Sequence, residues 1–124
     1  MTLLWVALGA AVGAPTRFLT DRALRARFGP AYPWGTLAVN VAGSLVLGVL
    51  AGAASVRPVP GGLVAGLGTG FCGALTTYST FGYETLRLAE EGPHRPWPAV
   101  ANIVISLTLG IGAAVLGWTL GRLT

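Results

Sequence analysis

The sequence predicts an all-α membrane protein in which four helices cross the bilayer, and three observations point to that class. Hydrophobic residues make up 53% of the chain and charged residues 10%, with a mean hydropathy of +0.70. A soluble domain carries roughly 25% charged residues, so this chain has too few to cover a water-facing surface. Four apolar stretches follow one another, each close to the ~20 residues that a helix needs to span a membrane. Alternating segments of about ten residues, which would indicate a membrane β-barrel, do not occur in the sequence.

The same composition excludes several other classes of protein. Disorder requires low hydrophobicity and high net charge, and a disulfide framework requires more than the single Cys72. The net charge of +4 comes from arginines in short gaps between apolar stretches, so no nucleic-acid partner is expected. Catalytic signatures such as HExxH and GxSxG do not occur, so the chain is not expected to be an enzyme.

The expected spans cover approximately residues 3–18, 34–56, 61–86 and 97–120, and they form one domain over residues 1–124. Spanning segments must satisfy their own backbone hydrogen bonds, which favours a helix in each. The connections are short, and an even number of spans puts both termini on one side of the membrane. Residues typical of loops mark the connections: Arg22, Arg25, Arg27, Gly29, Pro30 and Pro33 in the first, Arg57, Pro58 and Pro60 in the second, and residues 90–96 in the third.

Pairs of glycines at the GxxxG spacing recur through the spans. Small residues at this spacing let helix backbones approach closely, and this packing drives helix association in lipid. We expect most of these glycines to pack helices within the subunit. Because four thin helices bury little surface, self-association is also expected. The pairs are Gly9 and Gly13, Gly48 and Gly52, Gly66 and Gly70, and Gly117 and Gly121.

Polar residues interrupt the second and fourth spans, where such residues are costly and commonly functional. Asn40 in the second span suits an interhelical hydrogen bond and a pore about equally well. In the fourth span, Asn102 and Ser106 are one helical turn apart and therefore share a face. Both spans thus hold candidates for a polar path.

The third span carries the densest polar patch, residues 76–80, which reads Thr-Thr-Tyr-Ser-Thr. Four threonine and serine hydroxyls among five positions, close to Gly73, poorly suit a continuous apolar helix. The patch begins near the middle of the span, so we expect the helix to break near the bilayer midplane. A break at that depth exposes carbonyl oxygens and amide groups, and it is tolerated only where protein or a water-filled cavity covers it.

Taken in order, the motifs of these spans resemble those of the Fluc fluoride channels, also called the CrcB family. The similarity covers nearly the whole chain. GAAVGAPTR at 9–17 resembles the family's glycine-rich first span, and PWGTLAVN at 33–40, followed by Gly43 and Ser44, resembles its second. The third-span sequence is the most specific, with GFCG at 70–73, TTYSTF at 76–81 and Glu84.

The resemblance implies an antiparallel, dual-topology dimer of four-helix subunits with two fluoride pores and a structural sodium ion (Na+) at its centre. Backbone carbonyls of Gly73 and Thr76 from each subunit would hold the sodium ion. Arg17 would lie near a vestibule and attract anions, and Glu84 would lie by the other pore mouth. The pore would be lined by Asn40, Tyr78, Ser79, Thr80, Phe81 and Ser106, with Asn102 as a candidate further lining residue.

The function implied by the resemblance is passive, fluoride-selective conduction that lets toxic fluoride leave the cytoplasm through the cell membrane. Fluoride is small and strongly hydrated, so donors such as the Asn40 amide and the serine and threonine hydroxyls must replace its water. The positive edges of aromatic rings can also face an anion. Position 78 is a tyrosine where the family usually has phenylalanine, and Asn102 stands where some relatives have a tyrosine.

Arginines are distributed unequally between the two sides of the predicted bundle. Five lie on one side and two, Arg57 and Arg122, on the other. The positive-inside rule then makes the five-arginine side cytoplasmic and puts both termini outside. A dual-topology homodimer should show a smaller bias, so a homodimer is expected while pairing with an oppositely oriented homologue stays open. The five are Arg22, Arg25, Arg27, Arg87 and Arg95.

Two other functions compete with a fluoride channel. A small proton-coupled multidrug exporter has a similar four-helix layout but depends on a carboxylate within its first helix, and here Asp21 lies beyond the first predicted span. A non-transporting membrane subunit would leave the polar residues at 76–80 unexplained. The third-span motif therefore favours the channel.

Overall fold

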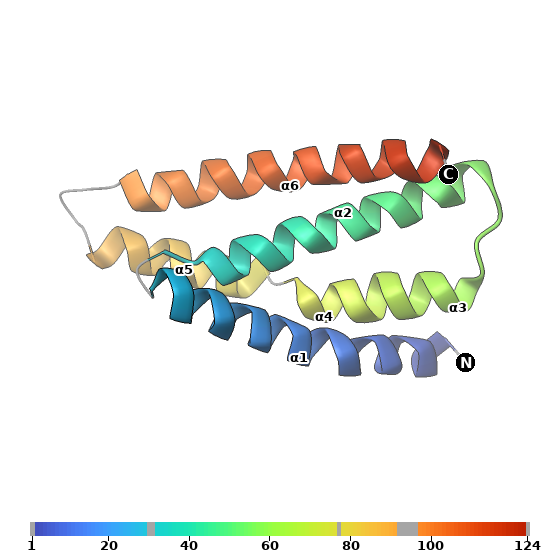
Figure 1. Ribbon diagram of the computed structural model, residues 1–124, viewed down its shortest axis with the longest axis horizontal. Coiled ribbons are helices and arrows are strands. Elements are labelled where there is room, and N and C mark those ends of the chain that lie inside the picture. Colours follow the sequence, from blue (N-terminus) through green and yellow to red (C-terminus); the bar gives the residue numbers. More distant parts are fainter. Residues whose placement is uncertain (1, 30–31, 77, 92–96, 124) are drawn as a thin grey trace.

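The structure, a computed structural model, is an all-helical subunit. It describes residues 2–29, 32–76, 78–91 and 97–123, and for residues 78–80 and 91 it describes the backbone alone. The described segments contain helices and short connections and no strand (Figure 1). The prediction of an all-α protein is therefore confirmed for this part of the chain.

Three long helices and one broken helical stretch make up the subunit. The long helices are α1 (Thr2–Phe28), α2 (Trp34–Val56) and α6 (Trp97–Leu123). The broken stretch begins with α3 (Gly61–Leu63), continues through the π-helix η1 (Val64–Cys72) and α4 (Gly73–Leu75), and resumes as α5 (Tyr78–Glu91). In Figure 1 the α3–α4 segment and α5 run in the same direction, one after the other.

The first helix is longer than the predicted span. Residues 19–28, expected to be largely a loop, are helical, because alanine, leucine and arginine are good helix formers. Asp21 and Arg25 pair one turn apart at 3.2 Å within this extension. The helix ends at Gly29, whose φ of +85° favours glycine and whose N–H donates to the Arg25 carbonyl at 2.9 Å. Arg22, Arg25 and Arg27 therefore belong to a helix and not to a loop.

Glycines let α2 and α6 pack backbone against backbone. A Cβ on Gly48 or Gly52 would overlap the carbonyl oxygen of Ala114 or Trp118 in α6. In return, a Cβ on Gly117 would overlap the Leu45 carbonyl oxygen in α2, and Gly121 lies against Val49 in the same way. The pairing of α2 with α6 is the most extensive helix contact in the described chain.

A second glycine contact joins α1 to η1. A Cβ on Gly9 would overlap the carbonyl oxygen of Gly66, and one on Gly13 would overlap that of Phe71. Gly70 lies equally close to Val6. All four predicted GxxxG pairs therefore pack helices inside the subunit, as expected for most of them, and are already occupied before a second copy is considered.

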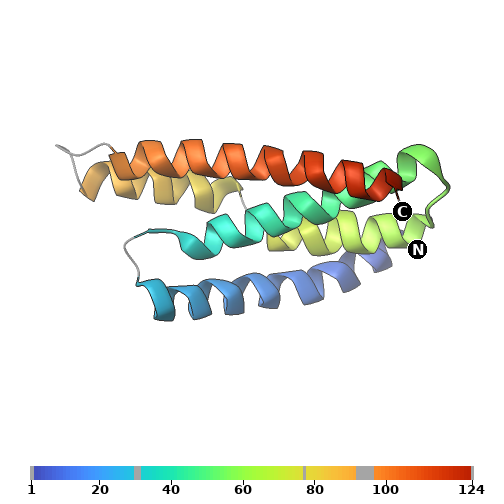
Figure 2. The same ribbon diagram turned by 45° about the horizontal axis from the view of Figure 1, so that its top comes forward.

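The outer surface of the subunit is apolar, and several of its most buried residues are polar. Leu3 and Ile111 are 81% and 64% exposed, whereas Glu84 and Asn102 are 7% and 2% exposed. By length and apolar composition, α1, α2 and α6 are each able to cross a membrane, and Gly61–Leu75 is a shorter apolar helix. Both termini lie at one end of the bundle in the two views (Figures 1 and 2), as the even number of predicted spans requires.

Candidate functional site

The helix break lies at Thr76, at the start of the predicted polar patch. Its N–H and its hydroxyl both donate to the Cys72 carbonyl oxygen, at 2.9 Å and 2.7 Å, and close the last turn of α4. Its backbone is then extended, with φ −82° and ψ 154°, so the helix stops there. The Thr76 methyl group lies over Gly43 of α2, in space that any Cβ on Gly43 would fill. The break predicted from the hydroxyl-rich sequence is thus present.

A groove of about 420 Å³, called here the central groove, opens beside the break between α2, α5 and α6. It gathers four site residues that were predicted in three different spans: Asn40, Thr76, Phe81 and Ser106. The predicted pore residues Tyr78, Ser79 and Thr80 form the first turn of α5, and their side chains lie outside the described part of the chain. The complete lining of the groove is Asn40, Ser44, Leu47, Thr76, Phe81, Ser106, Leu107, Gly110, Ile111 and Ala114.

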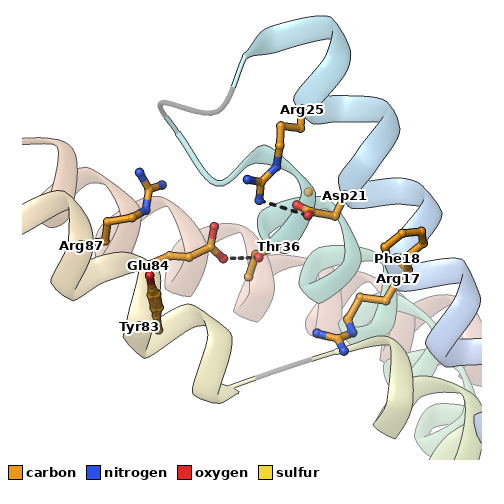
Figure 3. Close-up of a pocket in the computed structure, with 9 residues that line it drawn as sticks. Arg17, Phe18, Asp21, Arg25, Thr36, Tyr83, Glu84 and Arg87 are labelled. Carbon is orange, nitrogen blue, oxygen red and sulfur yellow. Dashed lines mark hydrogen bonds and ion pairs between the residues drawn. The ribbon is translucent and has the colours of Figure 1, made fainter.

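A second cavity of about 390 Å³, called here the arginine pocket, lies between α1, the start of α2 and the middle of α5. It contains three arginines and two carboxylates, so its net charge is positive. Figure 3 shows Glu84 of α5 facing Thr36 of α2, whose hydroxyl donates to the carboxylate, while Asp21 and Arg25 pair beside them. The pocket is lined by Arg17, Phe18, Asp21, Arg25, Gly35, Thr36, Tyr83, Glu84 and Arg87.

Arg17 and Glu84 line the same pocket, although the sequence analysis expected them at different pore mouths. The Nε of Arg17 is buried and has no hydrogen-bond partner among the described residues. Glu84 is buried and accepts a hydrogen bond from Thr36, so its carboxyl group is held in place on the α5 side. A positively charged cavity with an unsatisfied guanidinium donor is suited to attract an anion.

One face of α2 connects the two cavities, and the sequence analysis overlooked it. Thr36, Asn40 and Ser44 are spaced four residues apart and so follow one another along a single helix face. Thr36 lines the arginine pocket, and Asn40 and Ser44 line the central groove. The four-residue spacing of the three polar residues was the signal that could have identified Thr36 and Ser44.

Asn102 does not line the central groove. It precedes Ser106 by one helical turn in α6. It is only 2% exposed, and its amide nitrogen donates to the Thr85 hydroxyl at 2.8 Å. The Ser106 hydroxyl donates to the Asn102 amide oxygen at 3.4 Å. Asn102 thus contacts a groove residue without itself lining the groove.

The residues expected to hold sodium have the right kind of donor atom. Thr76 is extended, so its carbonyl oxygen is turned out of the α4 helix. Gly73 is exposed, with open space beside its Cα. Carbonyl oxygens in an unwound helix are the ligands that hold sodium ions in membrane proteins. Two carbonyls do not complete the coordination of a hard cation, so further ligands would have to come from outside the subunit.

Fold and site together define a multi-pass helical membrane protein whose polar side chains gather around a broken helix. A family model described as "CrcB-like protein, Camphor Resistance (CrcB)" matches residues 4–118. The chain belongs to this family, which confirms the resemblance drawn from the motifs.

Curated relatives match over nearly their whole length. The chain is 54% identical over 117 residues to "Fluoride-specific ion channel FluC 1" of Streptomyces avermitilis, covering 94% of this chain and 93% of the relative. It is 51% identical to the protein of the same name in Frankia casuarinae, covering 98% and 97%. A relative named "Fluoride-specific ion channel FluC" in Magnetococcus marinus is 43% identical, covering 99% of each chain.

Proposed function

We propose that this chain conducts fluoride passively and selectively across the cell membrane and lets toxic fluoride leave the cytoplasm. The observation that carries the proposal is the central groove, which brings Asn40, Phe81 and Ser106 together beside a helix break. The relatives are named fluoride-specific ion channels, which supports the same function.

The chemistry of the groove suits a small, strongly hydrated anion. The Asn40 amide and the Ser44 and Ser106 hydroxyls are neutral donors that can replace water around fluoride. The edge of the Phe81 ring carries partial positive charge and can face an anion. Neutral donors bind firmly enough to admit the ion and weakly enough to release it, as conduction requires. The arginine pocket, joined to the groove by the polar face of α2, is the mouth at which anions are concentrated.

The proposed topology has four spans. The apolar segment Gly61–Leu75 has 15 residues, about 22 Å of helix, which is short of a ~30 Å hydrocarbon core. Its continuation in α5 supplies the remaining length, so the two pieces form one span with its break near the midplane. The groove is partly open, which supports its completion by a second subunit. The antiparallel, dual-topology arrangement with two pores is part of the proposal because the family resemblance implies it.

A structural sodium ion at the centre of the dimer belongs to the same proposal. The carbonyl oxygens of Gly73 and Thr76 from both subunits would hold it, and the ion would fix the two breaks against one another. The extended backbone of Thr76 and the exposure of Gly73 support this role.

Ion release from liposomes tests the proposed function. Purified protein is reconstituted, and fluoride and chloride electrodes follow efflux with valinomycin and potassium removing the electrical limit on anion movement. We expect fluoride release to be much faster than chloride release. Release of both ions at similar rates would contradict selectivity. No fluoride release from folded protein, either alone or mixed with an oppositely oriented homologue, would contradict the channel.

A further inference from the structure

A chain of three hydrogen bonds runs from α5 to Ser106 in the central groove. The Thr85 hydroxyl donates to the Phe81 carbonyl oxygen at 2.8 Å. Thr85 in turn accepts from the Asn102 amide nitrogen at 2.8 Å. The Asn102 amide oxygen accepts from the Ser106 hydroxyl at 3.4 Å. These hydrogen bonds therefore link the backbone of one groove residue, Phe81, to the side chain of another, Ser106.

The protons of this chain determine which way the Asn102 amide faces. A hydroxyl has one proton to donate, and that of Thr85 is directed to Phe81. Thr85 can then only accept from its other neighbour, so the amide nitrogen of Asn102 faces Thr85 and the amide oxygen faces Ser106. Because Asn102 is 2% exposed, water does not compete for these positions.

We propose that Asn102 is a positioning residue that sets ion selectivity by holding the single hydroxyl proton of Ser106 away from the groove. While Ser106 donates to Asn102, it presents only lone pairs to a passing anion. An anion must draw the proton away from the amide oxygen before Ser106 can bind it. The bond that must be given up is long, at 3.4 Å, and therefore weak.

This competition favours strong hydrogen-bond acceptors. Fluoride accepts a hydrogen bond more strongly than an amide oxygen does, so it recovers the cost of turning the hydroxyl. Chloride is larger and a weaker acceptor, so it recovers less. Removing the amide oxygen should therefore help chloride more than fluoride. The inference rests on the proposed function, because it takes Ser106 as a donor to the permeant ion.

The test compares fluoride and chloride release from liposomes that hold the full chain as wild type, Asn102→Leu, Ser106→Ala and the double variant. Asn102→Leu keeps the branching at Cγ but removes the amide oxygen, so it frees the Ser106 proton. We expect its ratio of fluoride to chloride release to fall about twofold to threefold, the low end of the worth of one neutral hydrogen bond, because the 3.4 Å bond is weak. In the Ser106→Ala background the same substitution should leave the ratio unchanged, because the two residues act as a unit.

A second variant keeps the inference testable if Asn102→Leu does not fold. Thr85→Val is isosteric and removes the acceptor that orients the amide, so Asn102 can turn its nitrogen toward Ser106. We expect the same fall in the release ratio. The matched control is Thr119→Val on the exposed side of α6, where the hydroxyl donates only to the Val115 carbonyl at 3.0 Å. That variant should keep the wild-type ratio.

Three results would overturn the inference while the wild type still releases fluoride. The first is a ratio of fluoride to chloride release that is unchanged in both Asn102→Leu and Thr85→Val. The second is an equal decrease in the release of both ions, which would indicate a packing role only. The third is an Asn102→Leu effect that stays at full size in the Ser106→Ala background. A wild type that releases no fluoride, either alone or mixed with an oppositely oriented homologue, would instead overturn the proposed function, and the inference with it.

Discussion

At the scale of single residues, one methyl group packs against a glycine at the point where the helix breaks. A β-branched side chain has few rotamers, and that of Thr76 has its methyl over Gly43 and its hydroxyl on the Cys72 carbonyl oxygen. The absence of a side chain at Gly43 therefore leaves room for this rotamer of Thr76, the residue whose own backbone is extended.

Replacing Gly43 with alanine should disturb the break. The added Cβ would overlap the Thr76 methyl, and such overpacking costs roughly 1–3 kcal/mol. We expect a lower melting temperature in detergent and slower fluoride release. Gly112→Ala is the control, because a Cβ there meets no atom within 4 Å. Equal behaviour of the two variants would show that Gly43 does not hold Thr76.

Tyr78 is the residue at which this chain departs from the usual family pattern. Tyr78→Phe keeps the aromatic ring edge and removes one hydroxyl, so fluoride release should persist, with a rate changed by less than about tenfold. Tyr32→Phe is the control, because the Tyr32 hydroxyl has no partner among the described residues and lies in the connection before α2. Loss of release in Tyr78→Phe alone would mean that the hydroxyl is needed for conduction.

At the scale of elements, the sequence predicted which segments are helical better than it predicted how they end. A helix was expected at 34–56, and α2 is observed at Trp34–Val56, because loop residues bound a uniformly apolar run. The length of the first helix was underestimated, because its arginine-rich extension resembles a loop when only hydropathy is considered. The π-helix η1 was not anticipated, since no apolar or polar pattern distinguishes a π-helix from an α-helix.

The residues of the site were predictable where chemistry is unusual for a membrane. Asn40, Phe81 and Ser106 belong to different helices and were selected from their motifs, and the structure brings them to one groove. The hydrogen bond between Thr36 and Glu84 and the proton chain through Thr85 depend on how α2, α5 and α6 pack. Partners of this kind are set by tertiary structure, so a sequence alone does not identify them.

The α2–α6 contact should be intolerant of added volume. Gly117→Ala adds a Cβ that would overlap the Leu45 carbonyl oxygen, and backbone atoms cannot move aside as side chains do. We expect a loss of about 1–3 kcal/mol of unfolding free energy, measured in detergent. Gly112→Ala on the same helix should be neutral or slightly stabilising, because alanine favours helix over glycine by about 1 kcal/mol. If the two variants have the same unfolding free energy, α2 and α6 are not in backbone contact.

At the scale of the whole molecule, arginines are distributed unequally between the two ends of the subunit. A dual-topology homodimer needs a more equal distribution, because the same chain must insert in both directions. Arg57 lies at the end of the bundle that holds both chain termini, and its guanidinium donates to the Gly121 carbonyl oxygen at 3.0 Å. Both termini lie at that end (Figure 1). The arginine-rich last turns of α1 lie at the opposite end of the bundle. A subunit with this asymmetry should insert in one preferred direction, with its termini outside.

Insertion in one direction would require a partner of opposite bias to build the antiparallel dimer. A C-terminal tag on the full chain, tested for accessibility in intact cells and in inverted vesicles, measures the orientation directly. We expect the tag to be accessible mainly from outside. Arg22→Gln with Arg27→Gln, two exposed positions, lowers the excess of five arginines over two to an excess of one and should mix the orientations. Equal labelling of the wild type from both sides would contradict the fixed orientation and support the homodimer, because one sequence would then supply both halves.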